Sequence, residues 1–318
     1  RDGTAGPGGA LRRVPLGLQA APGEGPLRHK ERWLYGALLI TASTLMWSSA
    51  GFFVRALDLD VWTMVAWRSL FACLSLVPLA FMLRGRALLQ LRRSVGTGGA
   101  GAIPVMAVAM FSYVAALKLT SVANVMVVYA TVPFLAAGLA FLLLSERPGL
   151  RALCAAGVAF LGVIIMAGSA TAATDIAGNG FALLMTMGFA ASVVIARRWT
   201  SYDATLVTGL ASGLCALACF AVAFALLPTL PVPSLPQFGI LFLFSLATQS
   251  LSYLFFLLGS RHVPSAEAGL IALLDVVLGP LWVWLVFAEA PGTPALIGGA
   301  LVLLAVVGYL TLPRLLRA

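Results

Sequence analysis

The sequence contains few charged side chains. Only 10% of its residues are charged, whereas 61% are hydrophobic, and an ordinary soluble domain carries roughly 25% charged residues. Long apolar runs stand where a soluble protein would have charges. These runs are continuous and do not alternate with polar residues, which argues against a transmembrane β-barrel. The composition therefore predicts an all-α polytopic membrane protein.

Residues that enzymes and metal sites need are also scarce. The chain has two histidines and four cysteines, and the cysteines all lie within apolar runs without ligand or disulfide spacing. No H-E-x-x-H, G-x-x-x-x-G-K-[ST] or G-x-S-x-G motif occurs. We therefore expect no catalytic residues, no bound metal, no cofactor and no ATP hydrolysis.

Ten apolar segments follow an N-terminal stretch of different composition. Residues 1–32 are rich in Gly, Pro and charge, which predicts a disordered cytoplasmic tail. Each later segment is long enough for a membrane-spanning helix of about 20 residues. The predicted spans are 33–54, 61–83, 99–118, 121–144, 150–168, 177–197, 203–227, 238–259, 264–287 and 294–313.

The basic residues predict the orientation of these spans. Placing both termini in the cytoplasm puts 17 of the 20 Lys and Arg residues on the inside. Only Arg55 and Lys118 then lie outside, and Arg68 lies within the second span. Cytoplasmic loops are enriched in Lys and Arg, so we expect both termini in the cytoplasm. The net charge of +9 is then a topology signal, and nucleic-acid binding is not expected.

The two halves of the chain resemble each other. A shift of 143 residues aligns the stretch from Lys118 with the stretch from Arg261 without gaps, and it pairs Glu146 with Glu289. The shift corresponds to five helices, and an odd number of spans gives the copies opposite orientations in the membrane. We therefore predict two inverted five-helix repeats, 33–168 and 177–313, an architecture typical of secondary transporters.

Several motifs resemble the EamA-type family of the drug/metabolite transporter superfamily. They are Trp47-Ser48, the Arg68 motif WRSLFA, TSVANVMVVYATVP ending in SERP, and LLDVVLGP followed by FAEAP. The resemblance covers the chain from residue 33 onward. It implies five-plus-five inverted helices and alternating-access transport of a small metabolite in a lipid bilayer, and a monomer is compatible with it.

Bacterial amino-acid exporters of the YddG kind share this layout. The resemblance therefore favours amino acids or related amphipathic compounds, outward movement and the bacterial inner membrane. Two alternatives stay open. An uncoupled facilitator or exchanger for other metabolites or drugs would need no ion coupling, and a non-transporting membrane scaffold would need no polar cavity.

Asp275 is the only acidic residue near the centre of a predicted span. A carboxylate there costs about 2.5–3.5 kcal/mol on insertion scales, so it should face a cavity or a partner. The functional interpretation is proton coupling or binding of a substrate amine. The structural interpretation is a hydrogen bond that ties its helix to a neighbour near Gly279-Pro280.

Other polar and aromatic residues within the spans are candidates for lining a cavity. Aromatic walls with a few polar groups suit a small amphipathic substrate. Structural roles compete with this interpretation, because Trp and Tyr also anchor helices at the membrane interface and Ser joins helices. The predicted substrate-binding residues, with Asp275, are Trp47, Ser48, Tyr113, Tyr129, Gln249 and Tyr253.

Four further residues are predicted to be structural. Arg68 could bind an anion, but satisfying helix carbonyls or stacking on Trp62 or Trp67 is favoured. Glu267 stands in the first turns of a helix opened by Pro264, where an acid is stabilised by the helix dipole. Pro133 and Pro280, in the fourth and ninth spans, are candidate hinges.

Overall fold

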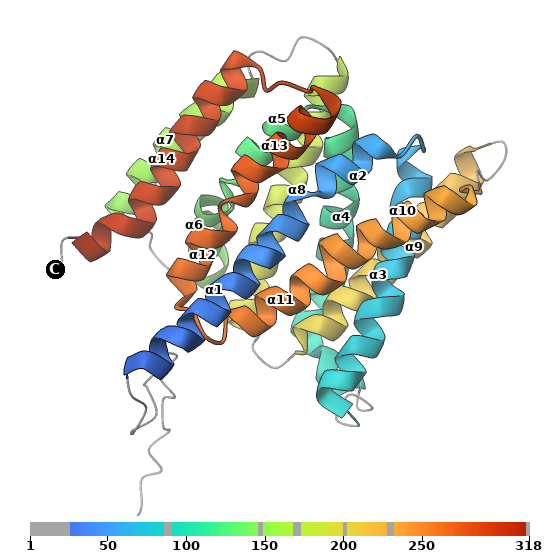
Figure 1. Cartoon of the computed structure of the whole chain (residues 1–318), viewed down its shortest axis with the longest axis horizontal. Coiled ribbons are helices and arrows are strands. Elements are labelled where there is room, and N and C mark those ends of the chain that lie inside the picture. The colour runs from blue at the N-terminus through green and yellow to red at the C-terminus, as the bar shows by residue number, and fades with distance from the viewer. Residues whose placement is uncertain are drawn as a thin grey trace, which may run out of the picture.

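The structure, a computed structural model, describes residues 26–85, 91–145, 149–167, 173–199, 202–227 and 232–315. These residues form helices and no strands (Figure 1). The helices are α1 (Pro26–Ser48), α2 (Ala50–Ala56), α3 (Val61–Arg84), α4 (Leu91–Leu119), α5 (Val122–Tyr129), α6 (Val132–Leu144), α7 (Leu150–Ala167), α8 (Ala173–Arg198), α9 (Ala204–Leu226), α10 (Leu235–Ser245), the π-helix η2 (Leu246–Leu251), α11 (Ser252–Gly259), α12 (Ser265–Ala272), α13 (Asp275–Phe287) and α14 (Thr293–Leu315).

The helices form a multi-pass membrane protein. Within the described residues, seven helices are long and apolar enough to cross a bilayer, and the bent pair α5–α6 brings the number to eight. The two remaining predicted segments coincide with α7 and α14, whose qualifying apolar stretches, Ala152–Ala167 and Thr293–Tyr309, are shorter. All ten predicted segments are thus helical, and ten crossings remain a prediction.

The first helix begins earlier than the composition suggested. We expected residues 1–32 to be a disordered tail, but α1 begins at Pro26. Proline is favoured at the first helical position because its fixed φ suits the helix and its missing N–H is not needed there. The part of the predicted tail before Pro26 lies outside the described residues.

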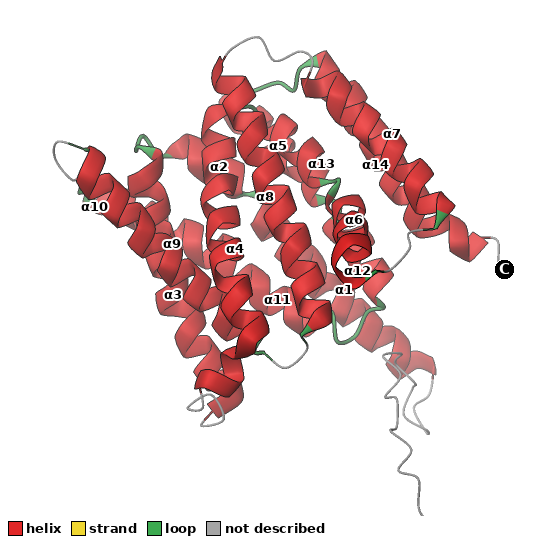
Figure 2. Ribbon diagram, turned by 180° about the vertical axis from the view of Figure 1, so that it is seen from behind, coloured by secondary structure: helices red, strands yellow, loops and turns green. Residues whose placement is uncertain are grey.

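The two halves of the bundle are interleaved. α3 packs against α9, α4 against α8, α1 against α11, α5 against α13, and α7 against α14. If each helix is replaced by the helix of the corresponding span in the other repeat, five spans away, the same set of pairs results. The pair α7–α14 lies along one edge of the bundle (Figure 1, Figure 2), and the other pairs build the body in which the core sits.

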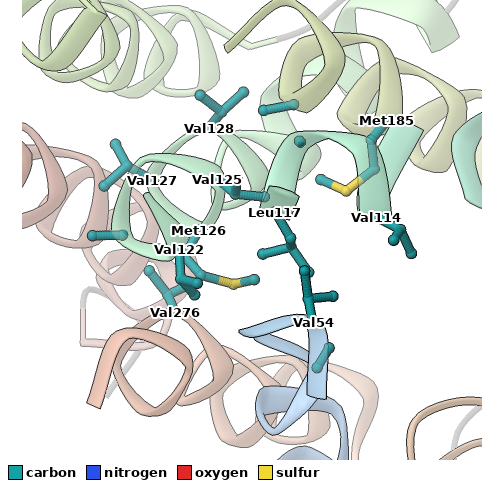
Figure 3. Close-up of a cluster of buried hydrophobic side chains, with 14 of the residues drawn as sticks. Val54, Val114, Leu117, Val122, Val125, Met126, Val127, Val128, Met185 and Val276 are labelled. Carbon is teal, nitrogen blue, oxygen red and sulfur yellow. The ribbon is translucent and has the colours of Figure 1, made fainter. Parts of the chain in front are cut away.

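A single large cluster of buried apolar side chains joins the central helices. Figure 3 shows Val54 of α2, Leu117 of α4, Val122 of α5 and Val276 of α13 converging on it. Gly51 allows α2 to approach closely, because a Cβ at that position would lie 2.8 Å from the Val122 side chain. Close packing of small residues is what holds helices together in a membrane, where lipid is as apolar as the side chains.

The fourth and ninth spans are each broken in the middle. α5 is followed by α6 after Ala130-Thr131, with a bend of 40°, and α12 is followed by α13 after Leu273-Leu274. Adding 143 to the bounds of α5 and α6 gives the bounds of α12 and α13.

The residues that end the second halves also correspond. Ser145 and Ala288 are the described non-glycine residues with positive φ, both at 55°. The shift of 143 found in the sequence is therefore repeated in the backbone.

The predicted hinge prolines stand differently with respect to these breaks. Pro133 lies in the first turn of α6, directly after the break. Pro280 lies inside α13, and the break of the ninth span lies earlier, at Leu273-Leu274, without a proline. A role as a hinge stays a prediction for both residues.

Candidate functional site

A cavity of about 190 Å³ lies in the middle of the bundle. Both halves of the chain and most of the central helices contribute to its wall, which is mainly apolar. The lining residues are Trp47, Arg68, Met106, Ala109, Met110, Tyr113, Met126, Tyr129, Met185, Phe189, Ser192, Thr208, Thr248, Gln249, Tyr253 and Asp275.

The structure brings six of the seven predicted binding residues to this cavity: Trp47, Tyr113, Tyr129, Gln249, Tyr253 and Asp275. Aromatic contacts fix two of them. The ring of Trp47 lies 5.3 Å from that of Phe256, and the ring of Tyr129 lies 5.7 Å from that of Phe189. Each of these two aromatic residues of the first half therefore contacts a phenylalanine of the second half.

Ser48 is the exception, because it does not line the cavity. Its hydroxyl donates to the carbonyl of Leu45 at 2.9 Å and accepts from Nε1 of Trp282 at 2.9 Å. The Ser48 hydroxyl therefore uses its hydrogen bonds within the protein, where the bond from Trp282 joins α13 to α1. The prediction that Ser48 contacts substrate is therefore not supported by its position.

Arg68 is placed otherwise than we expected. Its guanidinium lies over the ring of Phe244 at 4.5 Å, not over Trp62 or Trp67, and the side chain is 2% exposed. Nη2 donates a long hydrogen bond of 3.4 Å to the Thr248 hydroxyl. Nε and Nη1 are buried and have no partner among the described residues, so the cavity wall carries an incompletely bonded cation.

Asp275 is the first residue of α13 and is buried, with 7% of its surface exposed. Its Oδ1 is also without a hydrogen-bond partner in the described part of the chain. The described residues therefore supply no hydrogen bond from a neighbouring helix to this oxygen, although such a bond was the structural interpretation of Asp275. The break at Leu273-Leu274 directly before it places the carboxylate at the N-terminus of a half-helix, where the dipole favours negative charge.

Gln249 lies on η2, between α10 and α11. A π-helix shifts the helical register locally and often occurs at functional sites. Here Gln249 and Tyr253, from η2 and α11, both reach the cavity. The Oε1 of Gln249 is buried and without a partner among the described residues, so it is a third polar group available to a ligand.

The methionines of the cavity are functional candidates that the sequence did not reveal. Met106, Met110, Met126 and Met185 line the wall, where flexible and polarizable thioethers fit ligands of varied shape. In the sequence they are apolar residues among many others. Only the fold shows that these four face the same space.

A polar cluster closes the end of the bundle that holds the loops at 57–60 and 119–121. We call this the outer end, after the predicted orientation, and the opposite end the inner end. The cluster centres on Arg55, which forms an ion pair with Glu289 at 2.7 Å and donates to the carbonyls of Leu117 and Thr120. Glu289 also accepts from the backbone N–H of Val122 at 3.1 Å.

The Arg55 cluster joins four elements around the cavity: α2, the end of α4, the start of α5 and the segment after α13. The cavity itself extends the other way. Phe189 and Ser192 lie in the second half of α8 and Thr208 lies in the first turns of α9, so its wall continues toward the inner end. The bonds of the Arg55 cluster thus lie at one end, and the lining residues of the cavity extend toward the other.

Glu267 lies away from the cavity, near the inner end. It stands in the first turn of α12, as predicted, and its Oε2 accepts from Nε1 of Trp33 at 2.8 Å. No side-chain hydrogen bond caps α12. The hydrogen bond to Trp33 joins α12 to α1, and the stabilisation of Glu267 by the helix dipole stays a prediction.

The described residues contain no group of three or more His, Cys, Asp or Glu side chains that could hold a metal ion. The fold and the cavity together define the class: an all-helical multi-pass membrane protein with a central cavity built from both halves.

Comparison with known proteins gives the family. The model of the EamA-like transporter family matches residues 34–168 and again residues 176–311. The chain belongs to this family of membrane transporters within the drug/metabolite transporter superfamily.

The matched residues are two stretches of similar length, in agreement with two repeats in the sequence. No curated protein matches the chain. A solved crystal structure of another protein superposes with a TM-score of 0.61 at 18% identity, and the match covers 89% of this chain and 99% of that one. At this identity the similarity supports the fold alone.

Proposed function

We propose that the protein is a secondary transporter that moves amino acids or related small amphipathic metabolites outward across a cell membrane by alternating access. The observation that carries this proposal is the position of the cavity. It lies between the two family repeats and takes its wall from both. Binding near the membrane midplane at the repeat interface is the arrangement of many secondary transporters.

The matching positions of the broken helices support the two repeats as the moving units. If residues 33–168 and 177–313 are inverted copies, exchanging their conformations closes one end and opens the other. The Arg55 cluster then closes the outer end in the state described here. An exporter must load from inside, and a cavity that extends toward the inner end is suited to that step.

The test is transport by the purified chain in liposomes. We expect counterflow of a labelled apolar amino acid into vesicles loaded with the same compound. Met106→Trp, which fills the cavity, should abolish the flux. Val108→Trp is the matched control, because Val108 is 49% exposed on the same helix. A folded protein that moves no compound from an amino-acid panel would contradict the proposal and favour a scaffold.

Asp275 is the candidate for proton coupling within this proposal. Uptake should then respond to an imposed pH gradient in the wild type, and Asp275→Asn should remove the response while counterflow without a gradient continues at substrate concentrations that saturate the variant. An unchanged rate with and without the gradient would instead identify a facilitator or exchanger. Asp58→Asn is the control, since Asp58 is exposed in the loop after α2.

A further inference from the structure

We propose that the cavity recognises both charges of a zwitterionic amino acid with an apolar side chain. Arg68 binds the carboxylate and Asp275 binds the ammonium group, and the methionine wall takes the side chain. This inference rests on the proposed transport function and adds which groups of the ligand the site binds.

The first support is the unsatisfied cation. Arginine has five N–H donors and no acceptor, and only one atom, Nη2, has a partner, a bond of 3.4 Å to Thr248. Nε and Nη1 are buried without partners in the described residues. A charged group in this state within the membrane is costly, and a ligand carboxylate at the cavity wall would supply the missing acceptors.

The second support is the unsatisfied anion. Asp275 Oδ1 is buried and accepts no hydrogen bond from the described residues. An ammonium group has three donors and no acceptor, so it complements this oxygen. The unpaired Oε1 of Gln249 on the same cavity wall offers a second acceptor for the ammonium.

The third support is the separation of the two charges. Arg68 on α3 and Asp275 on α13 line one cavity, but they form no ion pair within 4.0 Å among the described residues. Opposite charges that would otherwise neutralise each other are held apart on helices of different repeats. A ligand with one positive and one negative group offers a partner to each of them, whereas a simple amine or a simple acid satisfies only one.

The rest of the cavity wall determines which side chain the amino-acid ligand can have. Met106, Met110, Met126, Met185 and Phe189 supply an apolar surface. An engineered apolar cavity of about 150 Å³ holds benzene, so the volume of about 190 Å³ measured here suits an aliphatic or aromatic side chain. A charged side chain would lie against this surface without a partner, which disfavours acidic and basic amino acids.

The test compares three ligands that differ in one group each. L-leucine carries both charges, L-leucinamide lacks the carboxylate, and 4-methylpentanoate lacks the ammonium group. Dissociation constants are measured by displacement of labelled leucine from the purified full chain. We expect the wild type to bind leucine at least tenfold more tightly than either analogue, since each analogue leaves one buried charge unpaired.

Two substitutions test which residue binds the carboxylate of the ligand and which binds its ammonium group. Arg68→Gln should reduce the preference for leucine over leucinamide to within about threefold and keep the preference over 4-methylpentanoate. Asp275→Asn should do the reverse. Arg261→Gln and Asp58→Asn, at exposed positions, should keep both preferences.

Equal binding of the three ligands by the wild type would overturn the inference and would leave the transport proposal intact if counterflow is present. The same holds if Arg68→Gln or Asp275→Asn, correctly folded by size-exclusion chromatography, keeps both preferences. The wild-type comparison decides the matter even if a variant does not fold. Absence of counterflow with every amino acid would contradict the transport proposal itself, and with it the inference.

Discussion

At the scale of residues, similar polar side chains within the spans have different roles. Ser48 and Gln249 are both uncharged and lie in apolar helices, but the Ser48 hydroxyl joins α1 to Trp282 and Gln249 faces the cavity. The difference lies in whether a partner within the protein satisfies the group. An unsatisfied buried group is costly, so those that remain at the cavity wall are the groups available to a ligand.

Ser48→Ala should destabilise the protein without changing the affinity for its ligand. The substitution leaves Nε1 of the partly buried Trp282 without the acceptor that lies 2.9 Å away, which costs about 1 kcal/mol, the low end of the range for a buried donor. Thermal unfolding should shift downward by several degrees, and the dissociation constant of leucine should stay within about twofold. Weaker binding by a fully stable Ser48→Ala protein would restore this residue to the binding site.

The candidate residues could be found in the sequence because polar and aromatic groups are conspicuous in apolar runs. Trp47, Tyr113 and Asp275 stood out in this way. The partner of Ser48 could not be found, because Trp282 lies 234 residues away. The cavity methionines could not be distinguished from other apolar residues. Helix carbonyls or an indole were expected beside Arg68, because nothing in the sequence places Phe244 beneath its guanidinium.

At the scale of elements, the broken spans show a correspondence that the sequence predicted only in part. The shift of 143 residues was visible, but the breaks at Ala130-Thr131 and Leu273-Leu274 were not. Pro133 adjoins the first break, whereas the second break has no proline and Pro280 lies inside α13, because a helix also ends where packing and turn residues end it.

Pro133→Ala should therefore leave the break in place. The corresponding break before Asp275 forms without a proline, with Val276 at the position equivalent to Pro133. We expect unfolding temperature and transport rate close to those of the wild type. Transport that is lost in a folded Pro133→Ala protein would show that the proline, and not the surrounding packing, maintains the bend.

Packing of α7 on α14 depends on two glycines in contact. A Cβ on Gly162 would lie 2.5 Å from the carbonyl oxygen of Gly298, whereas a Cβ on Gly157 of the same helix meets nothing within 4 Å. Alanine is favoured over glycine in helices by about 1 kcal/mol. Gly162→Ala should nevertheless lower the unfolding temperature, and Gly157→Ala should leave it unchanged or raise it. A matching response of the two variants would refute close backbone contact between these helices.

At the scale of the whole molecule, the proposed alternating-access cycle depends on the contacts at the outer end. The Arg55 cluster joins elements of both repeats, since Arg55 and the carbonyls of Leu117 and Thr120 belong to the first and Glu289 to the second. Relative movement of the repeats must break these bonds. Each state of a carrier is a population set by such differential contacts.

Glu289→Gln should shift the protein toward an outward-open state. The substitution removes the charge that pairs with Arg55, so closure at the outer end loses stability. In a cysteine-free background that carries Met126→Cys, a membrane-impermeant maleimide added outside should label the Glu289→Gln protein faster than the parent. Glu31→Gln, at an exposed position near the inner end, should leave the labelling rate unchanged; equal rates for all three proteins would exclude Arg55–Glu289 as the closing contact.

The closed outer end has a consequence for direction. In the proposed cycle, if the empty carrier favours the state in which the Arg55–Glu289 bonds are made, the site is open to the inside more often, and an extracellular competitor meets it less often. This asymmetry between the two sides of the membrane is kinetic. It changes the initial transport rates and the effect of inhibitors added on each side, but it cannot set the final ratio of substrate concentrations. Accumulation against a gradient would still require an ion or a counter-substrate to supply free energy.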